Sequence, residues 1–259
     1  MEAAPAPNMH VEDAAFLRAA VAALGLDLTA AQGAQFLTFR EMLITANATM
    51  NLTAITEPRA VLVRHFIDAL TCLVGCDEAR RAAPARVLDV GSGAGLPGLA
   101  LAIVLPHWQV VSLEATGKKV RFQESVIAAL GLTNATAVQG RAEDVAQLTG
   151  WRGGFSIVTA RALAALPTLL EWCQPFATVA GLTLAPKKGE LGAELAQGSR
   201  AAALLGGAAP EAIPLPSTLT DLVPELADGR VIVRVRQTRP CDARYPRTGA
   251  ASMKTPLGS

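Results

Sequence analysis

The stretch Asp89-Val-Gly-Ser-Gly-Ala-Gly-Leu-Pro-Gly98 is the most informative local pattern of the chain, and it continues a short apolar run over residues 86–90. An apolar run of this length predicts a buried strand, and residues 100–105 predict a helix beyond the turn. Glycines let the backbone approach a ligand closely, and the first turn of a helix has free N–H groups. A turn that merely closes a strand–helix unit accounts poorly for four glycines within eight residues. The stretch therefore predicts a ligand-binding turn.

Two fingerprints overlap in this turn. Gly93, Gly95 and Gly98 fit the G-x-G-x-x-G pattern of dinucleotide-binding folds. Asp89 with Gly91, Gly93 and Gly95 fits D-x-G-x-G-x-G instead, which resembles the first motif of the S-adenosylmethionine-dependent methyltransferases. The turn alone leaves a nicotinamide dinucleotide and S-adenosylmethionine both open.

Outward from this unit, predicted strands and helices alternate. Apolar runs predict the strands, and segments with helical spacing of apolar residues predict the helices. Alternation of this kind is typical of an α/β fold with a doubly wound, mostly parallel sheet of the Rossmann-like type. The strands are expected at 109–113, 135–139, 155–160 and 181–185, and the helices at 118–130 and 163–176.

Both ends of the chain depart from the alternation. Residues 1–80 predict an N-terminal helical extension that packs on a core over residues 81–240. Basic and apolar residues alternate over 230–236, which is typical of a half-exposed edge strand, and we expect it to be antiparallel. Residues 241–259 are expected to form an extended basic tail. The three N-terminal helices are expected at about 10–25, 29–46 and 57–76, and no element is predicted over 206–216.

Two further sites support a nucleoside ligand. Glu114, followed by Ala115 and Thr116, ends the second predicted strand, where an acid can accept hydrogen bonds from two ribose hydroxyls. Ala142 and Glu143 follow the third strand, at a loop that would pass an adenine ring. A solvated acid and an ordinary helix start are the plain alternatives. The spacing of Glu114 from the glycine turn favours the interpretation that Glu114 binds a ligand over that of a solvated acid.

The composition excludes several classes of protein. The 259 residues carry 23 Lys+Arg against 22 Asp+Glu, which excludes a uniformly basic nucleic-acid-binding surface but not a local basic patch. Hydrophobic residues make up 51%, enough for a sizeable core, whereas 4% aromatic residues make extensive base stacking unexpected.

The same counts bear on location and metals. No apolar run approaches the ~18 residues of a membrane-spanning helix, and residues 1–8 lack the basic start of a signal peptide. The four cysteines form no C-x-x-C pair, so we expect reduced thiols, no metal site and a cytoplasmic protein. No exposed apolar stripe suggests an obligate oligomer, and we expect a monomer.

Short motifs in order along the chain resemble the RsmG (GidB) family of bacterial methyltransferases. The motifs are Asn51-Leu-Thr-Ala-Ile55, Arg64-His-Phe-Ile-Asp-Ala-Leu70, the glycine turn, Gly117-Lys-Lys-Val-Arg-Phe122, Gly140-Arg-Ala-Glu143, Thr159-Ala-Arg-Ala162, Tyr245-Pro-Arg247 and Lys254-Thr-Pro-Leu257. The resemblance implies a class I S-adenosylmethionine-dependent enzyme that methylates N7 of a guanosine in 16S small-subunit ribosomal RNA.

The resemblance also implies site residues. For the cofactor they are Asp89, Gly91, Gly93, Gly95, Leu96, Glu114, Ala115, Thr116, Ala142, Glu143 and Arg161, with Arg161 near the methyl donor and foremost a residue that shapes the pocket. For RNA, basic residues cluster at the helix start near 118–121 and over 228–259, and both clusters could border the mouth of the pocket and contact phosphates. The candidates are Lys118, Lys119, Arg121, Arg244 and Arg247, and the resemblance adds Lys188. The plain alternatives are a solvated helix face and an exposed edge strand. Members of the family often carry Phe at the position of Leu96 and Arg at that of Thr248. The family's Lys-Gly after the fifth strand reads Pro186-Lys-Lys-Gly189 here, which favours Lys188.

Guanine N7 carries a free lone pair and no proton, so its methylation needs no general base. We therefore expect an in-line displacement driven by positioning and desolvation, with a structural role for His65. N7 faces the narrow groove of A-form RNA, so the target base must be unpaired or flipped out. The alternatives are a class I methyltransferase of a small molecule or protein, a dehydrogenase that uses the other glycine register, and a nucleotide-binding protein without activity.

Overall fold

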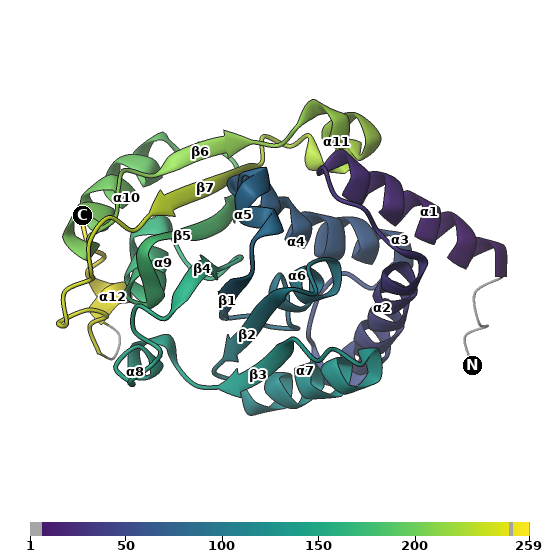
Figure 1. Ribbon diagram of the computed structural model, residues 1–259, viewed down its shortest axis with the longest axis horizontal. Helices are drawn as coiled ribbons and strands as arrows, with labels where there is room; N and C mark the ends of the chain where they lie inside the picture. Colours follow the sequence, from purple (N-terminus) through teal and green to yellow (C-terminus); the bar gives the residue numbers. More distant parts are fainter. Residues whose placement is uncertain (1–6, 249–250, 259) are drawn as a thin grey trace.

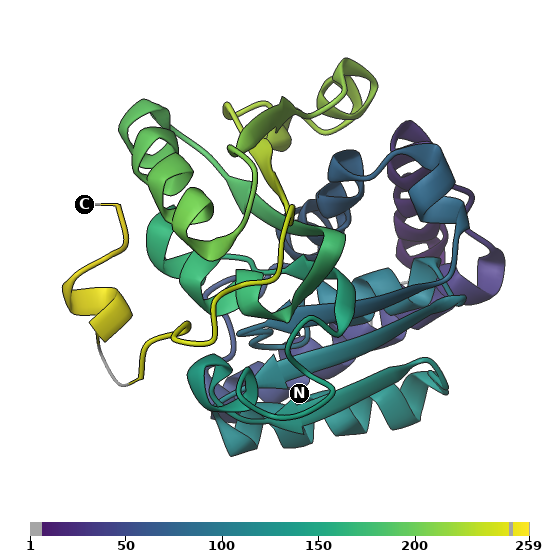
Figure 2. The same cartoon turned by 60° about the vertical axis from the view of Figure 1, so that its left-hand side comes forward.

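The computed structural model describes residues 7–248 and 251–258, which form a single seven-stranded sheet between layers of helices (Figures 1 and 2). The strand order is β3-β2-β1-β4-β5-β7-β6. Strands β1 to β5 are parallel, and β7 runs antiparallel to both β5 and β6. The strands are β1 (Ala85–Val90), β2 (Trp108–Glu114), β3 (Ala135–Gln139), β4 (Phe155–Thr159), β5 (Ala177–Lys187), β6 (Glu211–Pro214) and β7 (Val231–Arg236).

The apolar run that forms β1 is buried on both faces of the sheet. Val87 belongs to one hydrophobic cluster and the next residue, Leu88, to the other, and both are 0% exposed. Successive side chains of a strand point to opposite faces, so a continuous apolar run suits a central strand covered on both sides. The predicted doubly wound sheet is confirmed.

The cluster around Val87 contains the N-terminal helices together with those that follow β1 and β2. Figure 1 shows α2 lying against α6 and α7, at the right of the sheet. The second cluster contains the helices that follow β3, β4 and β5. The first group is α1 (Pro7–Ala23), α2 (Ala30–Met50), α6 (Gly98–Val104), α7 (Gly117–Leu130) and α11 (Ser217–Leu222), and the second is α8 (Ala142–Val145), α9 (Leu166–Cys173) and α10 (Gly192–Leu205).

The first two predicted helices are present, and local chemistry explains their ends. Thr29 caps α2, because its hydroxyl accepts from Gln32 N while the Gln32 side chain accepts from Thr29 N. Asn51 ends the helix in a left-handed conformation with φ 51°. Residues 1–6 lie outside the described residues, and α1 begins at Pro7.

The predicted helix at 57–76 is helical throughout but not uniform. It begins at α3 (Pro58–Val61), where the Glu57 carboxylate caps Arg59 N and Ala60 N. It then widens into a π-helical turn, η1 (Leu62–Ile67), continues as α4 (Asp68–Leu70) and tightens into a 3-10 turn, η2 (Thr71–Gly75). Short π-helical turns occur frequently at functional sites. A short helix, α5 (Glu78–Ala82), leads into β1.

Two predictions for the C-terminal third are wrong. Strand β7 is antiparallel as expected but does not lie at the edge, because the four-residue β6, in the segment left without an element, pairs along its outer side. Residues 241–248 and 251–258 do not form a free extended tail: Tyr245 and Leu257 are 6% and 8% exposed in the second cluster, and α12 (Ala251–Lys254) lies beside α9. The predicted helix at 163–176 is shorter, with α9 followed by the 3-10 turn η3 (Gln174–Phe176).

Within the described ranges, every helix is too short or too polar to cross a membrane.

Candidate active site

A cavity of about 680 Å³ opens at the carboxyl ends of β1, β2 and β3. Ligands of open α/β sheets bind at this edge, outside the ends of the strands. The structure brings five of the predicted cofactor residues to its wall: Gly91, Glu114, Ala115, Ala142 and Glu143. Lys119, expected to contact RNA, also lines it. We call this space the first cavity.

The glycine turn borders the first cavity with backbone and not with side chains. Gly91 and Gly93 have φ of 68° and 59°, a left-handed region that strains residues with a Cβ atom. The amides of Gly91 and Ser92 both donate to the carbonyl of Leu113 at the end of β2, at 2.8 and 3.1 Å. These bonds hold the turn against the neighbouring strand.

The side chain of Glu114 closes the same turn from the other side. Its Oε2 accepts from Gly93 N at 3.0 Å, and its Oε1 accepts from Thr116 N at 2.8 Å. Glu114 is 7% exposed and lines the first cavity. Each carboxylate oxygen has a further lone pair, so the group can hold the loop and still accept from ribose hydroxyls. Thr116 itself is exposed at the start of α7.

Asp89 lies beneath the turn and not on the cavity wall. Its Oδ2 accepts from Gly98 N at 2.8 Å and its Oδ1 from the Thr159 hydroxyl at 3.2 Å. The carboxyl group is 0% exposed, and burial raises its pKa to about 7 although both hydrogen bonds oppose that shift. Leu96 is also buried, and the Gly95 amide donates a hydrogen bond to Ser92 O. Asp89 therefore positions the loop, and direct contact of these three residues with a cofactor stays a prediction.

The sequence did not connect α9 or the C-terminal segment with the first cavity. Trp172 on α9 and Met253 on α12 form part of its wall, and Met253 is 66% exposed. Trp172 Nε1 is buried and finds no hydrogen-bond acceptor among the described residues. An aromatic side chain within a predicted helix gives no sign of which cavity it faces, and α12 was not predicted.

A second cavity of about 390 Å³ adjoins the first, and Ala162 lines both. Ala162 has φ 52°, an uncommon conformation for a residue with a Cβ atom. Arg161 lines this second cavity and not the first. The remaining wall is formed by Asp68, Pro186, Lys187, Lys188, Glu194 and Arg230.

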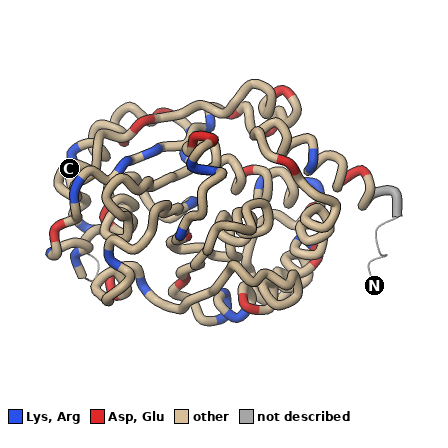
Figure 3. Tube along the Cα trace, viewed as in Figure 1, with Lys and Arg blue, Asp and Glu red and all other residues tan. Residues whose placement is uncertain are grey.

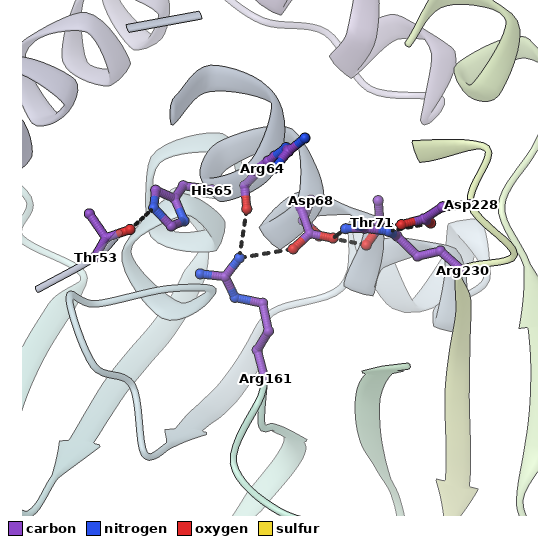
Figure 4. Close-up of polar contacts among 8 residues, drawn as sticks. All are labelled: Thr53, Arg64, His65, Asp68, Thr71, Arg161, Asp228 and Arg230. Carbon is purple, nitrogen blue, oxygen red and sulfur yellow. Dashed lines mark hydrogen bonds and ion pairs between the residues drawn. The ribbon is translucent and has the colours of Figure 1, made fainter. Parts of the chain in front are cut away.

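Asp68 joins the two sides of the second cavity. Figure 4 shows its carboxylate between two guanidinium groups: Oδ2 accepts from Arg161 Nη1 at 2.9 Å, and Oδ1 pairs with Arg230. Arg161 Nη1 also donates to the carbonyl of Arg64 within the π-helical turn, at 3.1 Å. The Asp228 carboxylate accepts a hydrogen bond from Arg230 Nη2. This hydrogen bond is the main reason that the pKa of Asp228 is lowered. The N-terminal extension, the end of β4 and the start of β7 thus meet at one carboxylate.

His65 lies in the same π-helical turn as Arg64 and near Arg161 (Figure 4). Its Nε2 lies 2.7 Å from the Thr53 hydroxyl. Burial, and next the positive charge of Arg161, lower the pKa of the imidazole to about 4. A neutral ring of such low basicity is a poor proton acceptor near pH 7, which agrees with the structural role expected for it.

The predicted RNA residues fall into two groups. Lys188 and Arg244 have side chains that are 67% exposed, and Arg121 is also exposed. Lys118 and Arg247 are engaged with the protein. Lys118 Nζ donates to Met50 O at 3.1 Å, and Arg247 forms an ion pair with Glu171, which is 0% exposed. That pair raises the pKa of Arg247. Figure 3 shows basic positions both along α7 and along the C-terminal segment.

Across residues 7–248 and 251–258, no three His, Cys, Asp or Glu side chains converge as metal ligands.

The strand order, the glycine turn after β1 and the acid at the end of β2 define a class I, Rossmann-like methyltransferase fold. The fold resembles that of a variant of MtNAS solved with S-adenosylmethionine, with a TM-score of 0.50 and 14% identity over 79% of this chain and 76% of that one.

The sequence comparisons identify the family. The family model described as "rRNA small subunit methyltransferase G" (GidB) matches residues 32–215, and the chain belongs to this family. The ribosomal RNA small subunit methyltransferase G of Dehalococcoides mccartyi is 39% identical over 92% of this chain and 97% of that protein. The protein of the same name from Geobacillus thermodenitrificans is 36% identical over 90% and 94%. The resemblance seen in the sequence motifs is confirmed.

Proposed function

We propose that this protein transfers the methyl group of S-adenosylmethionine to N7 of a guanosine in 16S ribosomal RNA, by direct in-line displacement without a general base. The coarser statement, a methyltransferase of small-subunit ribosomal RNA that uses S-adenosylmethionine, follows from its family. This membership also argues against the dehydrogenase, small-molecule and non-enzymatic alternatives.

The observation that carries the proposal is that two cavities meet at Ala162, with Arg161 beside the junction. The first cavity suits the cofactor: the backbone of Gly91, the Glu114 carboxylate for the ribose, and Ala142 and Glu143 for the adenine. When bound there, S-adenosylmethionine supplies an electrophilic methyl group. The second cavity then receives the nucleophile on the far side of the junction, which suits an in-line geometry.

The basicity of nearby groups supports a nucleophile that needs no deprotonation. The pKa of His65 is lowered to about 4, and Asp89 is buried under the glycine turn, where it already accepts two hydrogen bonds. Neither group suits proton removal from an amine or a hydroxyl. Guanine N7 presents its lone pair directly, so what remains for the protein is to orient the base and exclude water.

We propose that RNA approaches along a face bordered by the start of α7 and by the C-terminal segment. Lys119 and Met253, from these two segments, line the first cavity together, so the segments flank one opening. The exposed cations Arg121, Lys188 and Arg244 are the proposed phosphate contacts. We leave Arg247 out of this face, because its guanidinium is committed to Glu171. Monomeric action in the cytoplasm remains part of the proposal.

The test is methyl transfer from labelled S-adenosylmethionine to small-subunit RNA and to 30S subunits, both from cells that lack the enzyme. Nucleoside digestion and mass analysis should give labelled 7-methylguanosine, and the two substrates show whether the enzyme needs assembled subunits. A label at any other position of the nucleoside would contradict the N7 assignment. Binding of NAD in place of S-adenosylmethionine would contradict the cofactor.

A further inference from the structure

Glu194, in the first turn of α10, lines the second cavity. Its Oε1 accepts from the Leu166 amide at 2.6 Å and from Lys187 Nζ at 2.7 Å. Its Oε2 accepts from no residue among those that the structure describes, and the side chain is 25% exposed. The two bonds to Oε1 hold the carboxylate in one orientation, so Oε2 is an acceptor fixed in advance of any ligand.

The same cavity also holds uncommitted donors. Arg161 uses Nη1 for Asp68 and Arg64, whereas its Nε and Nη2 find no acceptor within residues 7–248 and 251–258. Lys188 is 67% exposed, and its ion pair with Asp228 is long, at 3.7 Å. The other two cations of the wall, Lys187 and Arg230, are already paired. The cavity therefore offers one free acceptor and several free donors.

This mixture selects among the parts of a nucleotide. A phosphate group has only acceptors, so it would leave the free Glu194 oxygen without a donor. Adenine has a lone pair at N1, which a carboxylate cannot satisfy. Guanine has adjacent donors at N1–H and at its 2-amino group, and an acceptor at O6. A cavity volume of about 390 Å³ lies within the range of small-ligand sites.

We propose that the second cavity binds the target guanine and that Glu194 selects it by accepting from N1–H and from the 2-amino group, while Arg161 supplies donors for O6. This inference rests on the proposed function and names the residue that selects the base. Methylation at N7 places a positive charge on the ring, and a carboxylate at the N1 side favours that cation through its charge. Glu194 thus acts in recognition and in the chemical step.

The first experiment compares two substrates with the unaltered enzyme. The methylated guanosine is located by mass analysis, and RNA is then rebuilt by ligation with guanosine or inosine at that position. Inosine keeps N7 and N1–H but lacks the 2-amino group. The expected result is a kcat/KM about 10-fold lower for inosine, because one hydrogen bond to a charged acceptor is lost. Equal rates with guanosine and inosine would overturn the inference.

The second experiment uses Glu194→Gln, which keeps an acceptor for Leu166 N and replaces Oε2 with a donor. With guanosine RNA, kcat/KM should fall about 10- to 100-fold, and the preference for guanosine over inosine should fall to about one. Glu211→Gln is the matched control, because Glu211 pairs with Arg234 on β7, outside both cavities. It should keep the full preference.

The outcomes distinguish a failure of the role of Glu194 from a failure of the proposed function. A Glu194→Gln enzyme that keeps the wild-type preference overturns the role of Glu194 alone. Wild-type enzyme that forms no 7-methylguanosine in any ribosomal RNA overturns the proposed function and this inference with it. Should Glu194→Gln fail to fold, the inosine comparison with the unaltered enzyme still decides whether the 2-amino group is recognised.

Discussion

The carboxylate of Glu114 accepts a hydrogen bond from the backbone amide of Gly93 at 3.0 Å, so the acid at the end of β2 holds the turn that follows β1. The same carboxylate lines the first cavity. One side chain therefore shapes the glycine turn and faces the cofactor, and loss of the carboxylate should affect both.

We expect Glu114→Ala to weaken S-adenosylmethionine binding by about 10- to 100-fold, since hydrogen bonds to a charged group contribute about 1.5–3 kcal/mol. Isothermal titration measures the Kd, and circular dichroism checks the fold. Glu124→Ala, an exposed acid on α7, is the matched control and should leave the Kd unchanged. An unaltered Kd for Glu114→Ala would remove Glu114 from the site.

Asp68→Asn should slow methyl transfer at least tenfold while the Kd of S-adenosylmethionine changes less than twofold. Asp68 anchors Arg161 beside the junction of the cavities but does not line the first one. Single-turnover rates and cofactor titration separate the two effects. Asp228→Asn is the control, because Asp228 also pairs with Arg230 but is 34% exposed. If Asp68→Asn lowered cofactor affinity as much as the rate, Asp68 would not act by positioning Arg161.

Arg247→Ala should lower the free energy of unfolding by about 3–5 kcal/mol, because it leaves the Glu171 carboxylate buried without its partner. Urea denaturation measures the change. Arg244→Ala removes an arginine from the same segment, but its ion pair with Asp242 is exposed, and the cost should stay below about 1 kcal/mol. If both variants lost the same small amount, the Arg247–Glu171 pair would have no role in stability.

The salt dependence of RNA binding should distinguish free cations from committed ones. Lys188→Ala and Arg244→Ala should each lower the slope of log Kobs against log salt by about 0.7–0.9, the value for one phosphate contact. Filter binding at several KCl concentrations gives the slopes. Arg247→Ala should leave the slope unaltered, since its guanidinium is bound to Glu171. A lowered slope for Arg247→Ala would return that residue to the RNA face.

Asp89 should make stability depend on pH. Its pKa is about 7 in the folded protein against 3.8 when exposed, so the folded state binds the proton more tightly. Its contribution to the free energy of unfolding is full below pH 3.8 and is lost as pH rises through 7, a change of roughly 4 kcal/mol. In denaturation experiments from pH 4 to 8, the stability of wild type relative to Asp89→Asn should fall by that amount. Asp221→Asn, an exposed acid on α11, controls for the lost charge, and a constant wild-type difference for Asp89→Asn would contradict the prediction.

Sequence patterns were enough to predict the five parallel strands, the glycine turn and the part of the first cavity that lies at the strand ends. These depend on local patterns: an apolar run such as the one that forms β1 needs cover on both faces, and residues at the ends of neighbouring parallel strands meet at one edge. Glu114 and Ala142 could be assigned to one cavity for that reason, although they are far apart along the chain.

The second cavity could not be predicted from the sequence, because its wall combines the N-terminal extension, the end of β4, the start of α10 and the start of β7. No periodicity reports that Asp68 lies between Arg161 and Arg230, or that Lys187 and not Lys188 binds Glu194. Arg247 shows the same limit: sequence places a cation in a basic tail, whereas packing of that tail on α9 gives the cation a buried partner. Charge along a chain is a local property, and the pairing of charges depends on which segments meet.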